Sequence, residues 1–231
     1  MTEVTASHGA EAGSPELDSE LESYRTELTG HAYRMLGSAF EAEDAVQETL
    51  IRAWKNYGSF EGRAALRSWL YRIATNVCLD MLSGAQRRAR PMDLGPAQPA
   101  DVQLLGSPQP EVTWLEPIPD ARVLPASSDP AEVAELRDSV RLAFVAALQN
   151  LPPKQRAVLI LREVLRWKAE EVAELLDTSV ASVNSALQRA RAAVGDEAKA
   201  GAKAPMDAEQ KSLLKRYVDA FQRYDMDDLT A

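Results

Sequence analysis

The sequence predicts an all-α protein made of two helical domains joined by a proline-rich linker. Over most of the chain, apolar residues recur every three, four or seven positions, the spacing of a helix with one buried face. No segment of useful length alternates apolar and polar residues as a strand does. Nine prolines between residues 91 and 130 separate the two helical parts, because each proline removes an amide donor and fixes its own φ angle.

The composition narrows the classes of function. The chain has 231 residues and a formal net charge of -9, which argues against nucleic-acid binding over the whole surface but permits a local basic patch. Cys78 is the single cysteine, and His8 and His31 have no cysteine partners for a zinc site, so we expect neither a metal nor a cofactor. No apolar run approaches the ~20 residues of a membrane span, and no signal peptide is evident. We therefore expect a cytoplasmic protein that makes no membrane contact.

The first predicted domain covers residues 18–90 and contains three helices. Residues 1–17 have no lysine or arginine and almost no large apolar residue, which predicts a disordered tail. Gly37 is a suitable C-cap for the first helix, and Ser38 with Glu41 predicts a capping box at the start of the second. The buried stripe of this second helix is predicted to be Val46, Leu50, Trp54 and Tyr57. The third helix follows the loop "GSFEG" and ends in a cluster of arginines.

The rest of the chain divides into three segments. Residues 91–130 are predicted to be an extended linker without a helix of useful length. Residues 131–195 form the second helical domain, whose first helix is expected to bury one stripe over residues 133–148. Residues 196–231 are a flexible linker followed by one amphipathic helix, which is marginal in water unless it packs on something.

Two short helices near the end of the second domain predict a helix-turn-helix. The break between them is "DTS", in which Ser179 is a natural N-cap for the second helix. That helix buries a stripe of apolar residues, and its outer face has hydrogen-bond donors and arginines but no carboxylate. A helix that enters the major groove needs such a face, because carboxylates would be repelled by phosphates. The outer face comprises Ser182, Asn184, Ser185, Gln188, Arg189 and Arg191. An ordinary helical hairpin with a solvated face would give the same periodicity.

The third helix of the first domain also carries basic residues with aromatic residues between them, a pattern that suits a single-stranded nucleic acid. Its candidate residues are Arg67, Ser68, Trp69, Arg72 and Asn76. Isolated aromatic residues such as Trp69 and Tyr71 are more often core residues. The two separate basic helices favour nucleic acid instead. The second helix is acidic instead, and because no histidine converges with its carboxylates we favour a solvated or protein-binding face over a metal site. These carboxylates belong to Glu41, Glu43, Asp44 and Glu48.

Two long blocks resemble a known family. "AYRMLGSAFEAEDAVQETLIRAW" and "ALRSWLYRIATNVCLDML" resemble region 2 of bacterial RNA polymerase sigma factors of the extracytoplasmic-function group, also called group IV. "LPPKQRAVLILREVLRWKAEEVAELLDTSVASVNSALQRARA" resembles region 4 of the same group. The resemblance covers about residues 21–195, and the blocks occur in the order of the family.

The resemblance implies a role for each candidate set. Asp44, Gln47 and Glu48 match the segment that docks on the clamp coiled coil of the β′ subunit. Arg67, Ser68, Trp69, Arg72 and Asn76 match the residues that open and read the −10 promoter element. The helix-turn-helix matches the part that reads the −35 element, and Leu151 to Leu165 match the part that packs near the β flap.

The resemblance thus implies a sigma factor, which binds core RNA polymerase and promoter DNA, directs transcription initiation and catalyses no reaction itself. The alternative is a stand-alone helix-turn-helix regulator that acts without the polymerase. Such a regulator would need neither the acidic helix nor the second basic surface.

Three features depart from the common pattern of the family. Asp177 stands where the turn usually has glycine, and we expect it to adopt the left-handed conformation that aspartate tolerates. The linker motif "WLEPIPD" and the tail "LLKRYVDAFQRYDMDDL" look like a subgroup with a C-terminal SnoaL-like domain, of which the tail resembles the first helix only. We expect Trp114 and Leu115 to pin the linker to the polymerase or to such a domain. Further candidate partners are the protein's own C-terminal domain and an anti-sigma factor.

Overall fold

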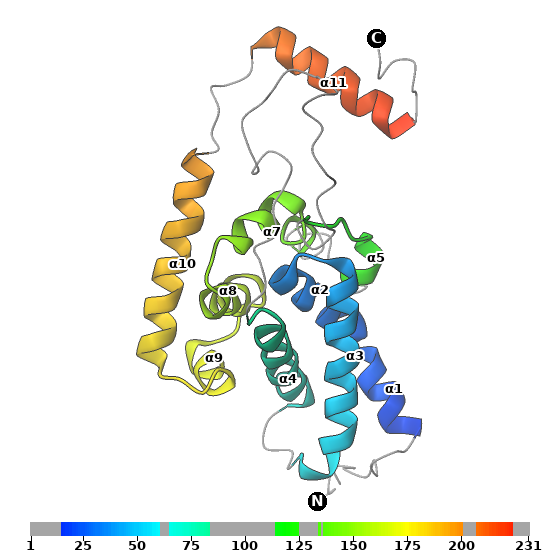
Figure 1. Ribbon diagram of the computed structural model, residues 1–231, viewed down its shortest axis with the longest axis vertical. Helices are drawn as coiled ribbons and strands as arrows, with labels where there is room; N and C mark the ends of the chain where they lie inside the picture. Colours follow the sequence, from blue (N-terminus) through cyan, green and yellow to red (C-terminus); the bar gives the residue numbers. More distant parts are fainter. Residues whose placement is uncertain are drawn as a thin grey trace, which may run out of the picture. The chain divides into compact units, whose positions relative to one another are not determined.

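The structure is a computed structural model that describes residues 15–60, 65–83, 114–124, 134, 136–200 and 207–223. The predicted all-α class is confirmed, since the described residues form helices and no β-strand (Figure 1). The chain divides into two units, residues 1–194 and 195–231. The described α-helices are α1 (Pro15–Ser23), α2 (Arg25–Leu36), α3 (Ala39–Asn56), α4 (Leu66–Met81), α5 (Asp120–Val123), α7 (Leu142–Gln149), α8 (Pro153–Leu159), α9 (Ala169–Leu175), α10 (Val180–Ala200) and α11 (Ala208–Arg223). A 3-10 helix, η1 (Tyr57–Ser59), follows α3, and a π-helix, η5 (Ile160–Val164), follows α8.

Helices α1 to α4 form the first bundle, in which α2 packs against both α3 and α4. At the junction between α2 and α3, the caps predicted at Gly37 and Ser38 are present. Gly37 has the left-handed φ of 75° and donates its N–H to the Tyr33 carbonyl at 2.8 Å. The Ser38 hydroxyl then accepts the Glu41 N–H at 3.2 Å, which caps the N-terminus of α3.

The boundaries of the first bundle differ from the expectation in two places. The helix expected before Gly37 is two helices, with a turn at Tyr24 between α1 and α2. Helix α1 begins at Pro15, inside the segment expected as a tail, because Leu17 is fully buried against the bundle. Residues 1–14 lie outside the described residues.

Most of the predicted stripes are buried. Val46 is fully buried and Leu50 is 9% exposed, but Trp54 is 47% exposed. The prediction of Trp54 as a core residue is therefore wrong. Ala53, beside it in the last turn of α3, is fully buried, so the covered face of this turn lies to one side of Trp54.

Residues 114–124, which we call the strap, pack on the first bundle although we predicted an extended linker there. The Tyr33 hydroxyl donates to the Glu116 carbonyl at 2.7 Å, and the Glu116 N–H donates to the Gly37 carbonyl at 3.1 Å. The Glu116 carboxylate accepts from the Ser38 hydroxyl at 2.6 Å and from the Ala39 N–H at 3.0 Å. A carboxylate at this position satisfies an amide at the N-terminus of α3 and complements the helix dipole.

Apolar contacts hold the two ends of the strap. Leu115 lies so close to Gly37 that a Cβ added to this glycine would be 2.6 Å from the leucine Cδ2. Val123, at the end of the short helix α5, is buried, and its carbonyl lies against Gly30. The structure thus gives Leu115 a partner inside the chain, where we had expected the polymerase or a further domain. The remaining parts of the predicted linker, 91–113 and 125–130, lie outside the described residues.

The second bundle follows the strap. The helix expected over residues 133–148 is interrupted by a turn at 139–141, and α7 begins after Arg141. The turn between α9 and α10 contains Asp177 with φ 49°, which confirms the left-handed conformation expected there. Arg166, just after η5, has φ 59°.

The apolar cores of both bundles are continuous within the first unit. Trp167 from the second bundle lies against Tyr71 of α4, with 5.3 Å between the ring centroids. Arg156 of α8 donates to the Met35 carbonyl of α2 and, at 2.7 Å, to Gln149 Oε1.

The second unit contains α11. Leu213, Leu214 and Tyr217 lie on this helix and are 63%, 46% and 54% exposed. The side chains of the following residues, 218–223, lie outside the described set.

Candidate nucleic-acid interface

Helix α10 presents the predicted polar face to solvent. Its N-terminus is capped by Ser179, whose hydroxyl accepts the Ser182 N–H at 3.1 Å. The predicted apolar stripe is buried, with Val183 and Ala190 fully covered and Leu187 5% exposed. All six candidate residues of the outer face are exposed, namely Ser182, Asn184, Ser185, Gln188, Arg189 and Arg191. The helix therefore offers donors on one accessible side and no carboxylate among these six.

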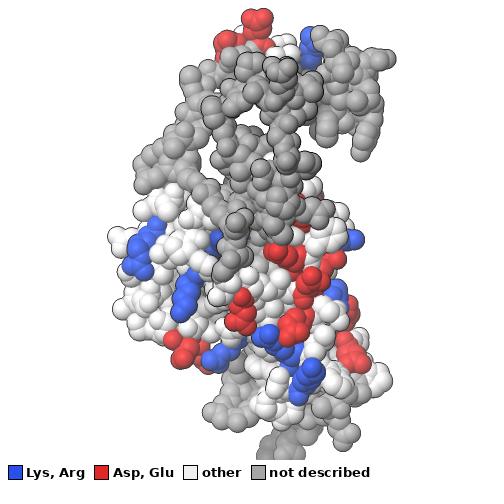
Figure 2. Space-filling model, viewed as in Figure 1, with Lys and Arg blue, Asp and Glu red and all other residues white. Residues whose placement is uncertain are grey.

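The two arginines of this face have different partners. Arg189 Nη1 donates to the Ser185 hydroxyl at 2.7 Å, a neutral acceptor on the preceding turn. Arg191 Nη2 forms an ion pair of 2.6 Å with Glu163 of η5. The Arg191 side chain is nevertheless 61% exposed, so the pair is open to solvent and weak. On the face seen in Figure 2, basic side chains lie over α10, and acidic and basic side chains are mixed over the rest of the described surface.

The candidate residues of α4 divide into covered and exposed ones. Arg67 is held by Glu27 of α2, with Nη2 2.8 Å and Nε 2.9 Å from Oε2 of that carboxylate. Its guanidinium also lies 5.0 Å from the centroid of the Tyr71 ring, a cation–π distance. Arg72 and Asn76 are exposed, one and two turns further along the helix. The sequence had not shown that Arg67 is paired inside the bundle.

Trp69 combines the two roles that the sequence left open. It is half-buried and joins an aromatic cluster, with its ring centroid 5.0 Å from that of Phe60 and 6.5 Å from that of Tyr57. Ser68, beside it, is half-buried as well. Phe60 and Tyr57 are functional candidates that the sequence reasoning missed. The aromatic spacing around "GSF" was the available signal.

The predicted polymerase-binding residues share one face of α3. Asp44 and Gln47 are exposed and Glu48 is half-buried, as expected for positions three and four residues apart. Glu48 Oε1 accepts from Arg52 at 2.6 Å, and Glu43 pairs with Arg122 of the strap. Among the described residues, no cation lies within ion-pair distance of Asp44. Asp44 is therefore the acid of this helix that is open to a partner.

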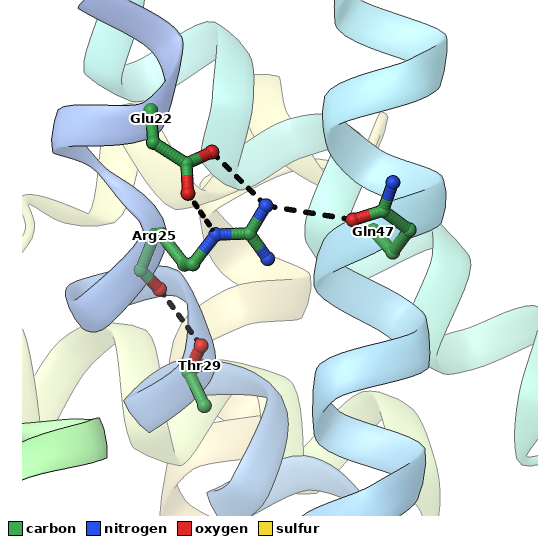
Figure 3. A network of polar contacts seen from close by, with 4 residues as sticks. All are labelled: Glu22, Arg25, Thr29 and Gln47. Carbon is green, nitrogen blue, oxygen red and sulfur yellow. Dashed lines mark hydrogen bonds and ion pairs between the residues drawn. The ribbon is translucent and has the colours of Figure 1, made fainter. Parts of the chain in front are cut away.

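Gln47 also connects α3 to α1 and α2 through one arginine (Figure 3). Arg25 Nη2 donates to Gln47 Oε1 at 3.4 Å and to Glu22 Oε2 at 3.0 Å, while its own carbonyl accepts the Thr29 hydroxyl at 2.8 Å. The network orients the Gln47 amide from one side. The amide nitrogen of Gln47 remains available at the surface.

An apolar groove of about 400 Å³ lies beside this network, between α1 and α3. Its walls include Leu21, Ile51 and Trp54, of which Ile51 is 36% exposed. Gln47 lines the same groove. We did not predict this groove, because the sequence pattern assigned Trp54 to the core.

Other classes of site find no support in the part of the chain that the structure covers. There, no three histidine, cysteine or carboxylate side chains converge on a point that a metal ion could occupy. None of the helices found there has the length and apolar content needed to cross a bilayer.

Two family descriptions match the chain. Residues 21–88 match Sigma-70 region 2, and residues 141–194 match Sigma-70, region 4. The two matched segments contain α2 to α4, α7 to α9 and most of α10, so they include all three candidate surfaces.

Similar proteins agree with this match. The ECF RNA polymerase sigma factor SigG of Mycobacterium tuberculosis is 52% identical over 212 residues, which cover 90% of this chain and 56% of SigG. SigW of Bacillus subtilis, another ECF sigma factor, is 32% identical over 171 residues, covering 74% of this chain and 82% of SigW. The crystal structure of the extracytoplasmic function sigma factor SigJ of Mycobacterium tuberculosis superposes with a TM-score of 0.52 at 27% identity, covering 92% of this chain and 62% of that chain.

The chain spans little more than half the length of SigG. It contains both matched regions in order, and it covers most of SigW. The chain therefore belongs to the extracytoplasmic-function RNA polymerase sigma factors.

Proposed function

We propose that this chain directs core RNA polymerase to promoters, by reading the −35 element with α10 and the −10 element with α4. The observation that carries the proposal is the exposed face of α10, which has six polar or basic side chains. The apolar stripe on the other side of this helix is buried. Asn184 and Gln188 suit base edges in the major groove, whereas Arg189 and Arg191 suit guanine or phosphate. In this proposal the chain itself catalyses no reaction.

Helix α4 suits the second element because it offers both charge and an aromatic surface. Arg72 and Asn76 are exposed for contacts with a DNA strand, and Trp69 presents part of its ring beside Ser68. Such a combination binds unpaired bases by stacking and the backbone by charge. Because Arg67 is held by Glu27, we assign it to the support of this face more than to direct DNA contact.

The exposed face of α3 is the proposed contact for the β′ clamp. Asp44 contributes a carboxylate without an internal cation among the described residues, and Gln47 and Glu48 flank it. Leu151 to Leu165 are proposed to lie near the β flap. The protein would act in the cytoplasm with the polymerase, and an anti-sigma factor and a SnoaL-like C-terminal domain remain further proposed partners.

A stand-alone helix-turn-helix regulator is not favoured. It would not need the matched region 2, whose α3 and α4 carry two of the three candidate surfaces. The two functions predict different results for DNA binding by the purified chain. A stand-alone regulator would bind a duplex tightly and selectively without the polymerase, and a sigma factor would not. A sigma factor is expected to bind its promoter only together with the polymerase. The linkage of its two recognition surfaces then raises the effective concentration of the second surface at its own site.

Run-off transcription on genomic fragments with purified core polymerase tests the proposal. We expect transcripts from a small set of fragments only when the chain is added. Arg189→Ala should reduce their yield, because it removes a phosphate or base contact worth about 1–3 kcal/mol. Arg141→Ala is the matched control, since Arg141 is an exposed arginine that pairs with Asp138 away from α10. Equal transcription without the chain, or equal loss in both variants, would contradict the proposal.

A further inference from the structure

A stripe of exposed side chains runs along α3. Among the described residues of the first unit, the exposed large apolar side chains all lie on this helix, with Phe40 70%, Ile51 36% and Trp54 47% exposed. Asp44 and Gln47 are exposed on the same stripe. The spacing of these five residues alternates between four and three, which is the spacing of a coiled-coil seam. The face therefore suits a partner that is itself a helix.

Two acids of α3 lie beside this seam. In a coiled coil, the residues that flank the seam pair with charges on the partner helix and set the choice of partner. Glu43 flanks the seam on one side, since it stands three residues after Phe40 and four before Gln47. Glu48, the residue after Gln47, flanks it on the other side. Both carboxylates are placed where a cation of a partner helix would lie.

Both flanking acids are already paired within the chain. Glu48 pairs at 2.6 Å with Arg52, which lies one turn further along the same helix. Glu43 pairs instead with Arg122 of α5, which is 79 positions away and belongs to the strap. The two side chains of this second pair are 58% and 45% exposed, so a partner protein can reach them.

The strap holds Arg122 beside α3 by contacts other than this ion pair. The Glu116 carboxylate accepts the Ala39 N–H at the start of α3, at 3.0 Å. Val123, the residue after Arg122, is buried in the first bundle. The Arg122 N–H donates to the Pro119 carbonyl at 2.9 Å within the strap. Loss of the Arg122 guanidinium therefore leaves these anchors of the strap in place.

We propose that Arg122 of the strap competes with the polymerase for Glu43, and thereby lowers the affinity of the α3 face for a basic partner helix. The proposal rests on the function proposed for α3. A partner helix that covers Asp44 must bring a cation to it, because a covered carboxylate without a cation is costly. The strap lies between the two matched regions, 21–88 and 141–194, so the competing charge comes from the linker.

Binding of the chain to purified core polymerase tests the proposal. Arg122→Gln should tighten binding by about two- to fivefold, because it frees the Glu43 carboxylate from an exposed ion pair. The gain should appear in the association rate and shrink as salt is added, as expected for a charge at the rim of an interface. Arg137→Gln is the matched control and should leave the affinity unchanged. It also removes one exposed arginine, from the other ion pair of the strap, 2.9 Å from Asp120.

A double-variant cycle shows whether the gain passes through Glu43. In the wild type, Glu43→Gln should change the affinity little, because Arg122 already occupies this carboxylate. In the Arg122→Gln background, the same substitution should abolish the gain. A gain that persists in the double variant would overturn the inference, and so would an Arg122→Gln protein that binds no more tightly than the wild type.

Asp44→Asn separates this inference from the proposed function. It removes the carboxylate of the seam and should weaken binding to the polymerase. If it weakens binding while Arg122→Gln does not strengthen it, the polymerase contact of α3 stands and the role of the strap is refuted. If Asp44→Asn binds as tightly as the wild type, the contact proposed for α3 fails, and the inference fails with it.

Discussion

His31 is a buried titratable residue in the centre of the first bundle. Its Nε2 lies 3.0 Å from the Thr75 hydroxyl, and its ring packs edge-on against Tyr71 at 5.2 Å. Burial lowers the pKa of His31 from 6.5 to about 3, and the positive charge of Arg34 acts in the same direction. The folded protein therefore keeps this imidazole neutral.

A prediction follows for the pH dependence of stability. Between pH 6.5 and 3 the unfolded chain binds a proton on this residue and the folded chain does not. The free energy of unfolding should thus fall as the pH is lowered through this window, by at most about 1.4 kcal/mol per pH unit from this group. Urea unfolding of the wild type and His31→Gln at pH 7.5 and 5.5 measures the effect. The wild type should lose about 1 kcal/mol more than the variant, and equal losses would contradict it.

Asp177 gives a second test at a single residue. Its φ of 49° was expected from the sequence, because the turn of a helix-turn-helix needs a residue that tolerates the left-handed region. Asp177→Ala should lower the free energy of unfolding by about 1 kcal/mol, while Asp177→Gly should leave it unchanged or raise it. Thermal unfolding of both variants measures this. If the alanine and glycine variants have the same free energy of unfolding, the left-handed backbone at residue 177 does not limit the stability of the turn.

At the scale of the element, periodicity predicted α3, α4 and α10, because each buries a regular stripe. Serine N-caps also marked the start of α3 and α10, whereas α4 begins after Ala65, which offers no side-chain cap. These signals did not predict the strap. Its proline-rich sequence lacks a helical period, and its bonds join Glu116 to residues such as Tyr33, which is 83 positions away. The pairing of Arg67 with Glu27, 40 positions apart, was hidden for the same reason.

Two glycines test whether the strap is part of the folded bundle. A Cβ at Gly30 would lie 2.6 Å from the Val123 carbonyl oxygen, a backbone atom, so Gly30→Ala should displace the strap and cost about 1–3 kcal/mol. A Cβ at Gly58 would meet nothing within 4 Å, so Gly58→Ala should change stability by no more than about 0.5 kcal/mol.

Urea unfolding measures both variants, and limited proteolysis shows whether residues 114–124 become a cleavage site in Gly30→Ala only. Equal stability and equal cleavage patterns would mean that the strap does not depend on this close approach to α2.

At the scale of the whole molecule, the net charge of -9 conceals an uneven distribution. The sequence predicted a carboxylate-free face on α10, but not that Glu163 of η5 reaches Arg191 of that face. Arg189 and Arg191 look alike in the sequence. The fold makes them different, because one donates to a serine and the other is paired with an acid.

This difference predicts opposite effects on promoter binding. Arg189→Ala should weaken the binding of the holoenzyme and lower the slope of log K against log salt by about 0.9, the value for one lost phosphate contact. Glu163→Gln should strengthen binding by about two- to fivefold, because it frees Arg191 from an exposed pair worth up to about 1 kcal/mol. Fluorescence anisotropy on a labelled promoter fragment, over a series of salt concentrations, measures both. Arg141→Ala provides the baseline for the loss of an exposed arginine elsewhere. If Glu163→Gln binds no better than the wild type while Arg189→Ala behaves as expected, the ion pair with Glu163 does not limit Arg191, and Arg189 supplies the charge that α10 presents to DNA.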